Sequence, residues 1–257
     1  MKQLMIAALT AAFVSLPATA SAQQGIAILS TGTVVAKNSA VIVAKVVAYV
    51  KKINADAGDT VKKGQPLVVL DGAEFAADAA LSQGRLDEAV AVEANAGKQY
   101  RRMESLMAKG STTQSALDDA ATAHERAKAG VAIAKAALAR ANAYLGYATL
   151  RAPFDGIVEF RKVELGELTA PGQPLMKVTD TVHLRFETSV KESDVNRIAV
   201  GDTVNVFVDA LGETPVSGTV AHLVPSGDPA SHSFTVRIDL APTKGMKPGM
   251  YGKVRWQ

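Results

Sequence analysis

The chain has 257 residues and a nearly balanced charge, with 28 Lys and Arg against 25 Asp and Glu. It contains no cysteine, which excludes disulfides, thiolate metal sites, thiol nucleophiles and a lipid anchor attached to a cysteine. The even charge and the aromatic fraction of 5% argue against a nucleic-acid-binding surface.

The N-terminus is typical of a secretory signal peptide. Lys2 supplies the positive charge, and an apolar run follows over Leu4–Leu16. Small residues then offer a cleavage site at Ala20-Ser21-Ala22, or alternatively at Ala18-Thr19-Ala20. The run is about 13 residues long, whereas a membrane-spanning helix needs about 20, so an uncleaved anchor is the weaker alternative. We therefore predict that residues 1–22 are removed and that the mature protein is periplasmic, held at the inner membrane only by partners.

A sequence motif occurs twice in the chain. Gly, five residues, and then Gly-Gln-Pro-Leu begins once at Gly58 and again at Gly166. Glycine suits tight turns with a positive φ, and proline fixes the entry into the following segment. The segments that follow are short and rich in Val and Leu, as strands are. The repeat predicts two similar β half-units.

Each half-unit also has a candidate strand before the motif, at 41–50 in the first copy and at 156–163 in the second. Two such half-units facing each other would make a small β-sandwich. We assign this domain to residues 40–72 and 148–180.

Residues 73–147, between the two copies, have a helical composition. They are rich in Ala, Glu, Lys, Arg and Gln and lack proline. Apolar and small residues recur at alternating steps of three and four, which predicts two helices of about 33 residues, each about 50 Å long, packed as a coiled-coil hairpin. The predicted seam positions are Ala79, Ser82, Leu86, Ala89, Glu93, Ala96, Tyr100, Met103 and Met107, and then Leu117, Ala120, His124, Ala127, Val131, Ala134, Leu138, Ala141 and Leu145.

The helical pattern breaks at 109–113. Gly110 fits a helix C-terminus, and Ser111, Thr112 or Thr113 could cap the next helix. Such a hairpin exposes most of its surface, so we expect it to pack against other hairpins or against a helical partner.

The remainder of the chain predicts a small β-barrel, made from residues 25–39 and 181–257. A short helix is expected at 192–198, and 31–35 could add a strand. The alternating segments lie at 182–188, 203–208, 218–224, 233–240 and 252–256.

Several stretches resemble the periplasmic adaptor subunits, or membrane fusion proteins, of the HlyD-like type. Residues 46–71 resemble the first lipoyl-like half-motif, and Thr149–Val158 resembles the segment that opens the second. Gly245-Met246-Lys247-Pro248-Gly249-Met250 is similar to a turn near the end of the family's barrel. The resemblance implies an elongated mixed α and β protein, in which a lipoyl-like sandwich is interrupted by a helical hairpin and followed by a barrel. The family's membrane-proximal domain is expected to be absent.

The resemblance also implies a docking site at the hairpin tip. In adaptors of resistance-nodulation-division pumps the tip carries an Arg, a Leu four residues on, and a Ser seven further on. Arg102 and Leu106 match here, and Thr113 replaces the Ser while keeping the hydroxyl. From the residues alone, an Arg and a Leu four apart are common on any helix.

The same resemblance implies the partners. These are an inner-membrane transporter, an outer-membrane channel of the TolC type, and other copies of the chain in a trimer or hexamer. The transporter is expected to be a proton-driven resistance-nodulation-division pump that exports drugs or other toxic compounds. An ATP-driven exporter is the alternative.

We expect no enzymatic activity, catalytic residue or cofactor. A carrier domain would present a lysine for lipoate or biotin in the turn between its halves, but this chain has Asp71-Gly72-Ala73-Glu74 there. Of the four histidines, His124 falls in the helix seam, and His183, His222 and His232 lack the spacing of a metal site. A carrier subunit and a periplasmic metal-binding efflux component are the rival hypotheses.

Overall fold

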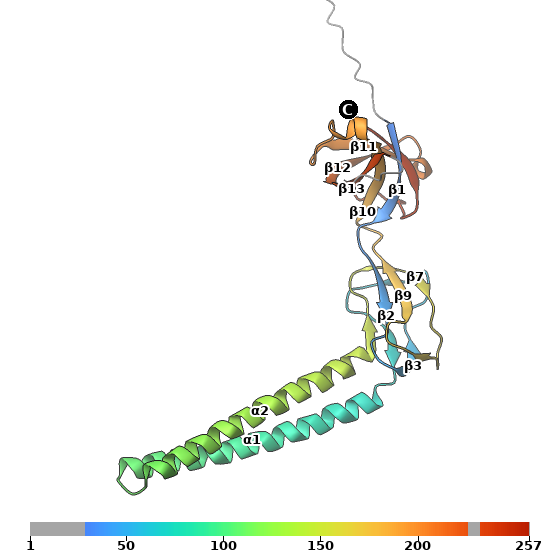
Figure 1. Ribbon diagram of the computed structural model, residues 1–257. Coiled ribbons are helices and arrows are strands. Elements are labelled where there is room, and N and C mark those ends of the chain that lie inside the picture. Colours follow the sequence, from blue (N-terminus) through green and yellow to red (C-terminus); the bar gives the residue numbers. More distant parts are fainter. Residues whose placement is uncertain (1–28, 226–231, 257) are drawn as a thin grey trace, which may run out of the picture.

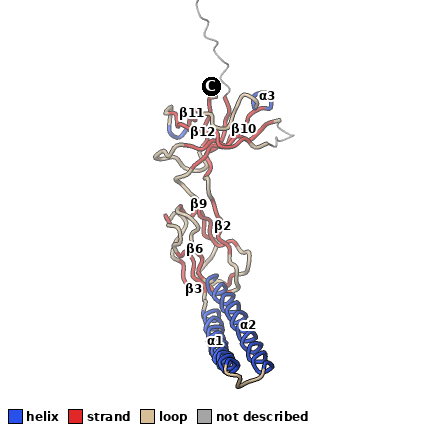
Figure 2. Tube along the Cα trace, turned by 90° about the vertical axis from the view of Figure 1, so that its left-hand side faces the viewer, coloured by secondary structure: helices blue, strands red, loops and turns tan. Residues whose placement is uncertain are grey.

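The computed structural model describes residues 29–225 and 232–256, and the predicted signal peptide lies outside these ranges. Three units follow one another along the molecule: a β-barrel, a β-sandwich and a long helical hairpin (Figures 1 and 2). The predicted fold class is confirmed by this arrangement. No helix in the described ranges is both long and apolar enough to span a membrane.

The sandwich is built from two four-stranded sheets, ordered β2-β9-β7-β4 and β6-β5-β3-β8. The first half-unit supplies β2 to β5 and the second supplies β6 to β9, so each half contributes two strands to each sheet. The strands are β2 (Ser39–Val43), β3 (Ala48–Ile53), β4 (Thr60–Val61), β5 (Pro66–Leu70), β6 (Thr149–Arg151), β7 (Gly156–Arg161), β8 (Leu168–Thr169) and β9 (Pro174–Thr179).

The single strand predicted at 41–50 is wrong, because this stretch forms the separate strands β2 and β3 in different sheets. Between them the chain passes from one sheet to the other, with Ala44 and Val46 buried on the way. A continuous Val-rich run conceals this corner, since the residues that cross the core are as apolar as those in the strands.

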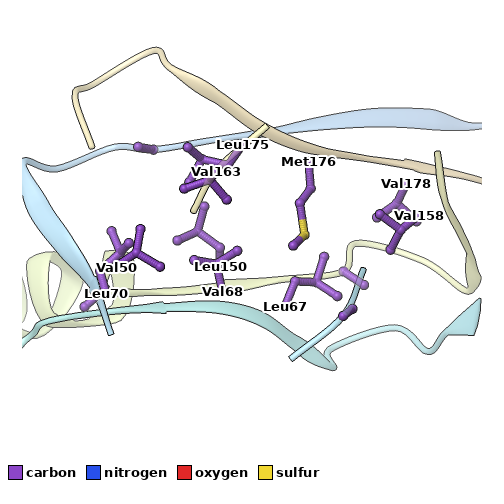
Figure 3. Packing of buried hydrophobic residues seen from close by; sticks show 14 of the residues in the cluster. Val50, Leu67, Val68, Leu70, Leu150, Val158, Val163, Leu175, Met176 and Val178 are labelled. Carbon is purple, nitrogen blue, oxygen red and sulfur yellow. The ribbon is translucent and has the colours of Figure 1, made fainter. Parts of the chain in front are cut away.

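The sandwich core is drawn from both half-units. Leu67 and Val68 of the first copy face Leu175 and Met176 of the second, and all four are fully buried (Figure 3). The positive φ predicted for the motif glycines is confirmed, with values of 95° and 81° in the first copy and 80° and 86° in the second. Neither half could bury its apolar face without the other.

The C-terminal unit is a closed barrel in the order β1-β10-β13-β12-β11-β14. Closure pairs every strand on both sides and so leaves no exposed sheet edge. Phe186, Val206 and Ile238 fill the interior. The predicted helix at 192–198 is shorter in the structure, and a 3₁₀ turn, η1, follows β11. The bounds are β1 (Leu29–Ala36), β10 (Leu184–Lys191), α3 (Glu192–Val195), β11 (Thr203–Val208), η1 (Asp209–Leu211), β12 (Pro215–Leu223), β13 (Ser233–Leu240) and β14 (Tyr251–Arg255).

Asp180 ties together the two chain segments that join the barrel to the sandwich. Its buried carboxylate accepts hydrogen bonds from the backbone N–H groups of Val182 and His183, at 2.9 and 3.0 Å. It also accepts one from Asn38 Nδ2 at 3.2 Å, and His183 Nδ1 lies 2.9 Å from it. Burial by itself would raise the pKa of Asp180, but these hydrogen bonds outweigh it and hold the pKa below its ordinary value.

The hairpin consists of α1 (Ala73–Ala108) and α2 (Gln114–Tyr147). The helices lie side by side and extend away from the sandwich (Figures 1 and 2). The predicted seam is confirmed, because every one of its positions is buried or partly buried while most other helix positions are exposed. Small seam residues such as Ala79 and Ala127 allow the two helices to approach closely.

Candidate docking surface on the helical hairpin

The hairpin tip is a short turn shaped by backbone hydrogen bonds. The Leu106 carbonyl accepts from Lys109 N at 3.1 Å and from Ser111 N at 2.9 Å, and the Met107 carbonyl accepts from Gly110 N at 2.9 Å. Gly110 has a φ of 67°, so the predicted glycine at the helix C-terminus is confirmed. These bonds satisfy carbonyls that the end of α1 would otherwise leave unpaired.

Thr113 caps α2. Its backbone is extended, and its hydroxyl oxygen accepts a hydrogen bond from Ala116 N at 3.3 Å. Of the three residues considered for this role, Thr112 instead places its hydroxyl 3.9 Å from Met103 Sδ, and Ser111 bonds back to the Lys109 carbonyl. The Thr113 hydroxyl therefore stabilises the start of α2 within the chain itself, without a partner protein.

The three predicted docking residues come together at the tip. Arg102 and Leu106 lie one turn apart near the end of α1, and Thr113 lies across the turn at the start of α2. Leu106 is partly buried, whereas Arg102 and Thr113 are exposed. The Arg102 side chain makes no hydrogen bond or ion pair with any residue in the described ranges, so its guanidinium is free to meet a carboxylate.

A polar cluster interrupts the seam in the tip-side half of the hairpin. His124 Nε2 of α2 lies 2.8 Å from Glu93 Oε1 of α1, and the Tyr100 ring stacks on the imidazole with a centroid distance of 5.8 Å. A Cβ at Gly97 would lie 3.1 Å from His124 Nε2, so the absence of a side chain there gives the imidazole room. The seam pattern placed Glu93 and His124 on facing helices, but it carried no signal that they pair.

The described residues contain no group of three or more His, Cys, Asp or Glu side chains that could hold a metal ion. At the position where a carrier domain would present its lysine, the chain leaves β5, passes Asp71 and Gly72, and enters α1. The Asp71 carboxylate accepts a hydrogen bond from Ala73 N at 3.1 Å. The chain therefore begins a helix at this position, where a carrier domain would have a tight turn that bears a lysine.

Two family models match most of the described chain. Residues 38–180 match the CzcB-like barrel-sandwich hybrid domain, and residues 186–257 match the CusB-like β-barrel domain. The first match includes the sandwich and the whole hairpin, and the second includes all of the barrel strands except β1 and the first residues of β10.

Two curated relatives are similar to this chain in amino-acid sequence. The nickel and cobalt resistance protein CnrB of Cupriavidus metallidurans is 29% identical over 262 residues, covering 96% of this chain and 62% of the relative. The multidrug resistance protein MdtE of Escherichia coli is 29% identical over 217 residues, covering 78% of this chain and 56% of the relative. The chain thus spans about three-fifths of the length of these relatives.

Solved structures share the fold. A MacA–MexA chimera that contains the α-hairpin domain of Pseudomonas aeruginosa MexA superposes with a TM-score of 0.64 at 22% identity. The superposition covers 89% of this chain and 80% of the chimera. The superposed 89% of this chain includes parts of all three units, the sandwich, the hairpin and the barrel.

Proposed function

Since the chain belongs to the CzcB-like periplasmic adaptors, the membrane fusion proteins of resistance-nodulation-division pumps, we propose that it links an inner-membrane transporter to an outer-membrane channel of the TolC type. In this proposal the protein takes part in the export of drugs or other toxic compounds. It performs no chemistry itself, and the transporter, proton-driven in this proposal, supplies the energy.

The observation that carries the proposal is the separation of the barrel and the hairpin tip along one elongated chain. The barrel lies at one end and the hairpin tip at the other, with the sandwich between them (Figure 1). The α1 helix alone has 36 residues. A helix of that length extends about 54 Å at 1.5 Å per residue, which suits a linker better than a pocket-bearing enzyme.

In the assembled pump the tip residues Arg102, Leu106 and Thr113 meet the helical mouth of the channel, and the barrel meets the periplasmic part of the transporter. Several copies, three or six, surround the channel entrance. The mature chain works in the periplasm after its signal peptide is cleaved. The names of CnrB and MdtE, which refer to metal and multidrug resistance, support an efflux role.

Replacing Arg102 by Asp tests the tip assignment. Arg102 is exposed and has no partner among the residues that the structure describes. Arg102→Asp should therefore fold normally while turning an attraction to carboxylates on the channel into a repulsion. In a strain lacking the wild-type gene, we expect the resistance conferred by the pump to fall to near the level of the deletion. Minimum inhibitory concentrations, with immunoblotting for protein level, provide the measurement.

Arg101→Asp is the matched control. Arg101 is also exposed and carries the same charge, but the helix turns it about 100° away from Arg102. We expect this variant to retain most of the resistance. Unimpaired export in Arg102→Asp, or an equal loss in both variants, would count against a docking role for Arg102.

A further inference from the structure

A cleft of about 1170 Å³ lies between the barrel and the sandwich, beside the segments that join them (Figure 1). The barrel contributes β1 and the turn at 242–249, and the sandwich contributes β7 and β9. Ligands of drug size occupy clefts of about 300–1,000 Å³, so this cleft has room for a small molecule.

Much of the cleft wall is aliphatic. Val35, Ile157 and Pro248 are partly buried there, and Val182 is 58% exposed in the segment that leads from the sandwich to the barrel. The described residues that line the cleft include no aromatic ring on which a planar ligand could stack. Such a wall suits an aliphatic chain, because covering exposed apolar surface is favourable.

The charges on the sandwich side of the cleft are paired. The Glu159 carboxylate accepts a hydrogen bond from Thr179 Oγ1 at 2.7 Å and another from Lys177 Nζ at 2.9 Å. These two bonds hold the pKa of Glu159 below its ordinary value, so the carboxylate is ionised at neutral pH. Glu159 therefore neutralises Lys177, and this wall adds little net charge.

The barrel side of the cleft carries two cations without counter-ions. Lys244 and Lys247 are exposed, and neither side chain makes a hydrogen bond or ion pair with any residue in 29–225 or 232–256. Their turn is anchored, because Met246 is buried in the barrel core and Gly249 N donates to the Val34 carbonyl at 2.7 Å. The cleft thus has a net positive charge on a fixed turn next to an aliphatic wall.

We propose that this cleft binds a single-chain amphiphilic anion such as a fatty acid. The carboxylate would face Lys244 and Lys247, and the aliphatic chain would lie along Val35, Ile157 and Val182. A membrane phospholipid offers similar chemistry with two chains, and the experiment below separates the two sources. The inference goes beyond the proposed function and needs neither transporter nor channel.

Calorimetric titration of the purified protein with dodecanoate, below its micelle concentration, tests the site. We expect saturable one-to-one binding. The dissociation constant should be at least about tenfold lower than that of dodecyltrimethylammonium, which has the same chain and a positive charge. Acetate, which has the carboxylate without the chain, should bind at least about a hundredfold more weakly than dodecanoate.

Charge reversal separates a specific site from a general attraction of anions. Lys244→Glu combined with Lys247→Glu should raise the dissociation constant for dodecanoate at least about tenfold. Lys51→Glu combined with Lys52→Glu is the matched control, because these exposed residues of β3 lie outside the cleft and the net charge changes equally. The control should shift the constant by less than about twofold. Circular dichroism checks that both proteins are folded.

A second pair of variants tests the aliphatic wall. Val182→Asn should raise the dissociation constant about threefold or more, because a polar group replaces an apolar contact. Val200→Asn, at a position that is 66% exposed and outside the cleft, should leave it unchanged.

No saturable binding of dodecanoate, equally tight binding of the cationic amphiphile, or equal effects of the two charge reversals would overturn the proposal. Binding to phosphatidylglycerol vesicles without binding of free dodecanoate would also overturn it, because the ligand would then be a membrane surface. The titrations use the chain alone, so a failure to recover transporter or channel from cells would leave them unchanged.

Discussion

At the scale of single residues, several glycines mark places where strands approach too closely for any side chain. A Cβ at Gly156 would lie 2.5 Å from the Thr179 carbonyl oxygen and 3.1 Å from Val178 Cγ1. The backbone oxygen cannot yield without disturbing the pairing of β7 with β9. Gly84 in α1 presents the reverse situation, since nothing lies within 4 Å of its Cβ position.

Alanine substitutions at these two glycines should therefore have opposite effects. Gly156→Ala overpacks the sandwich and should destabilise the chain by about 1–3 kcal/mol. Gly84→Ala removes a poor helix former from an exposed position and should stabilise the hairpin by about 1 kcal/mol. Thermal unfolding followed by circular dichroism is the measurement. An unchanged or raised melting temperature in Gly156→Ala would contradict the close approach at Gly156.

Asp180 makes the stability of the junction between barrel and sandwich depend on pH. The pKa of Asp180 is lowered in the folded chain, so its contribution to stability is complete above the unfolded pKa and is lost as the pH falls through the folded pKa. Asp180→Asn should cost about 1–3 kcal/mol at neutral pH. The amide oxygen can still accept from the backbone N–H groups of Val182 and His183, but the amide NH₂ that replaces Oδ2 cannot accept from Asn38 Nδ2. The difference from the wild type should shrink below about pH 4.

Urea unfolding at neutral pH and near pH 3 compares the two proteins. Asp119→Asn, at an exposed position on α2, serves as the control and should leave stability nearly unchanged. A difference between wild type and Asp180→Asn that stayed constant with pH would contradict the hydrogen-bonded, ionised carboxylate.

At the scale of elements, Thr113 combines two roles that substitutions can separate. Thr113→Ala removes the cap and should destabilise α2 by about 1 kcal/mol, whereas Asn is as good a cap as Thr. If Thr113 also docks the channel through its hydroxyl, Thr113→Asn should keep the stability of the hairpin and lose export, and Thr113→Ser should keep both. Full resistance in Thr113→Asn would show that capping is its whole contribution. Thermal denaturation measures the capping contribution of Thr113, and resistance assays measure its contribution to export.

The elements show why some features could be predicted and others could not. The seam of the hairpin was predictable because its spacing repeats over many turns, and the strands of the sandwich followed from a motif that occurs twice. The split between β2 and β3 was hidden by an unbroken apolar run. The Glu93–His124 pair and the Asp180 cluster depend on which side chains meet in space, and neither spacing nor composition carries that information. The tip residues Arg102, Leu106 and Thr113 came from family resemblance, and their docking role stays a prediction.

At the scale of the whole molecule, the two half-units explain the architecture. Because each half gives two strands to each sheet, the closed core forms only when both halves are in place. The hairpin is inserted between the two halves, after β5 and before β6, so α1 and α2 both join the sandwich at the same end (Figure 1). The barrel is joined at the opposite end through the segments that Asp180 ties together. This places the two proposed contact regions at the ends of the molecule.

The central claim is that the chain bridges a transporter and a channel. The most direct test is cross-linking in cells followed by affinity purification of the tagged protein and mass spectrometry. We predict recovery of both an inner-membrane transporter and an outer-membrane channel from wild-type cells, and recovery of the transporter with little channel from the Arg102→Asp strain. Recovery of neither partner from wild-type cells that express the whole pump would contradict the adaptor function.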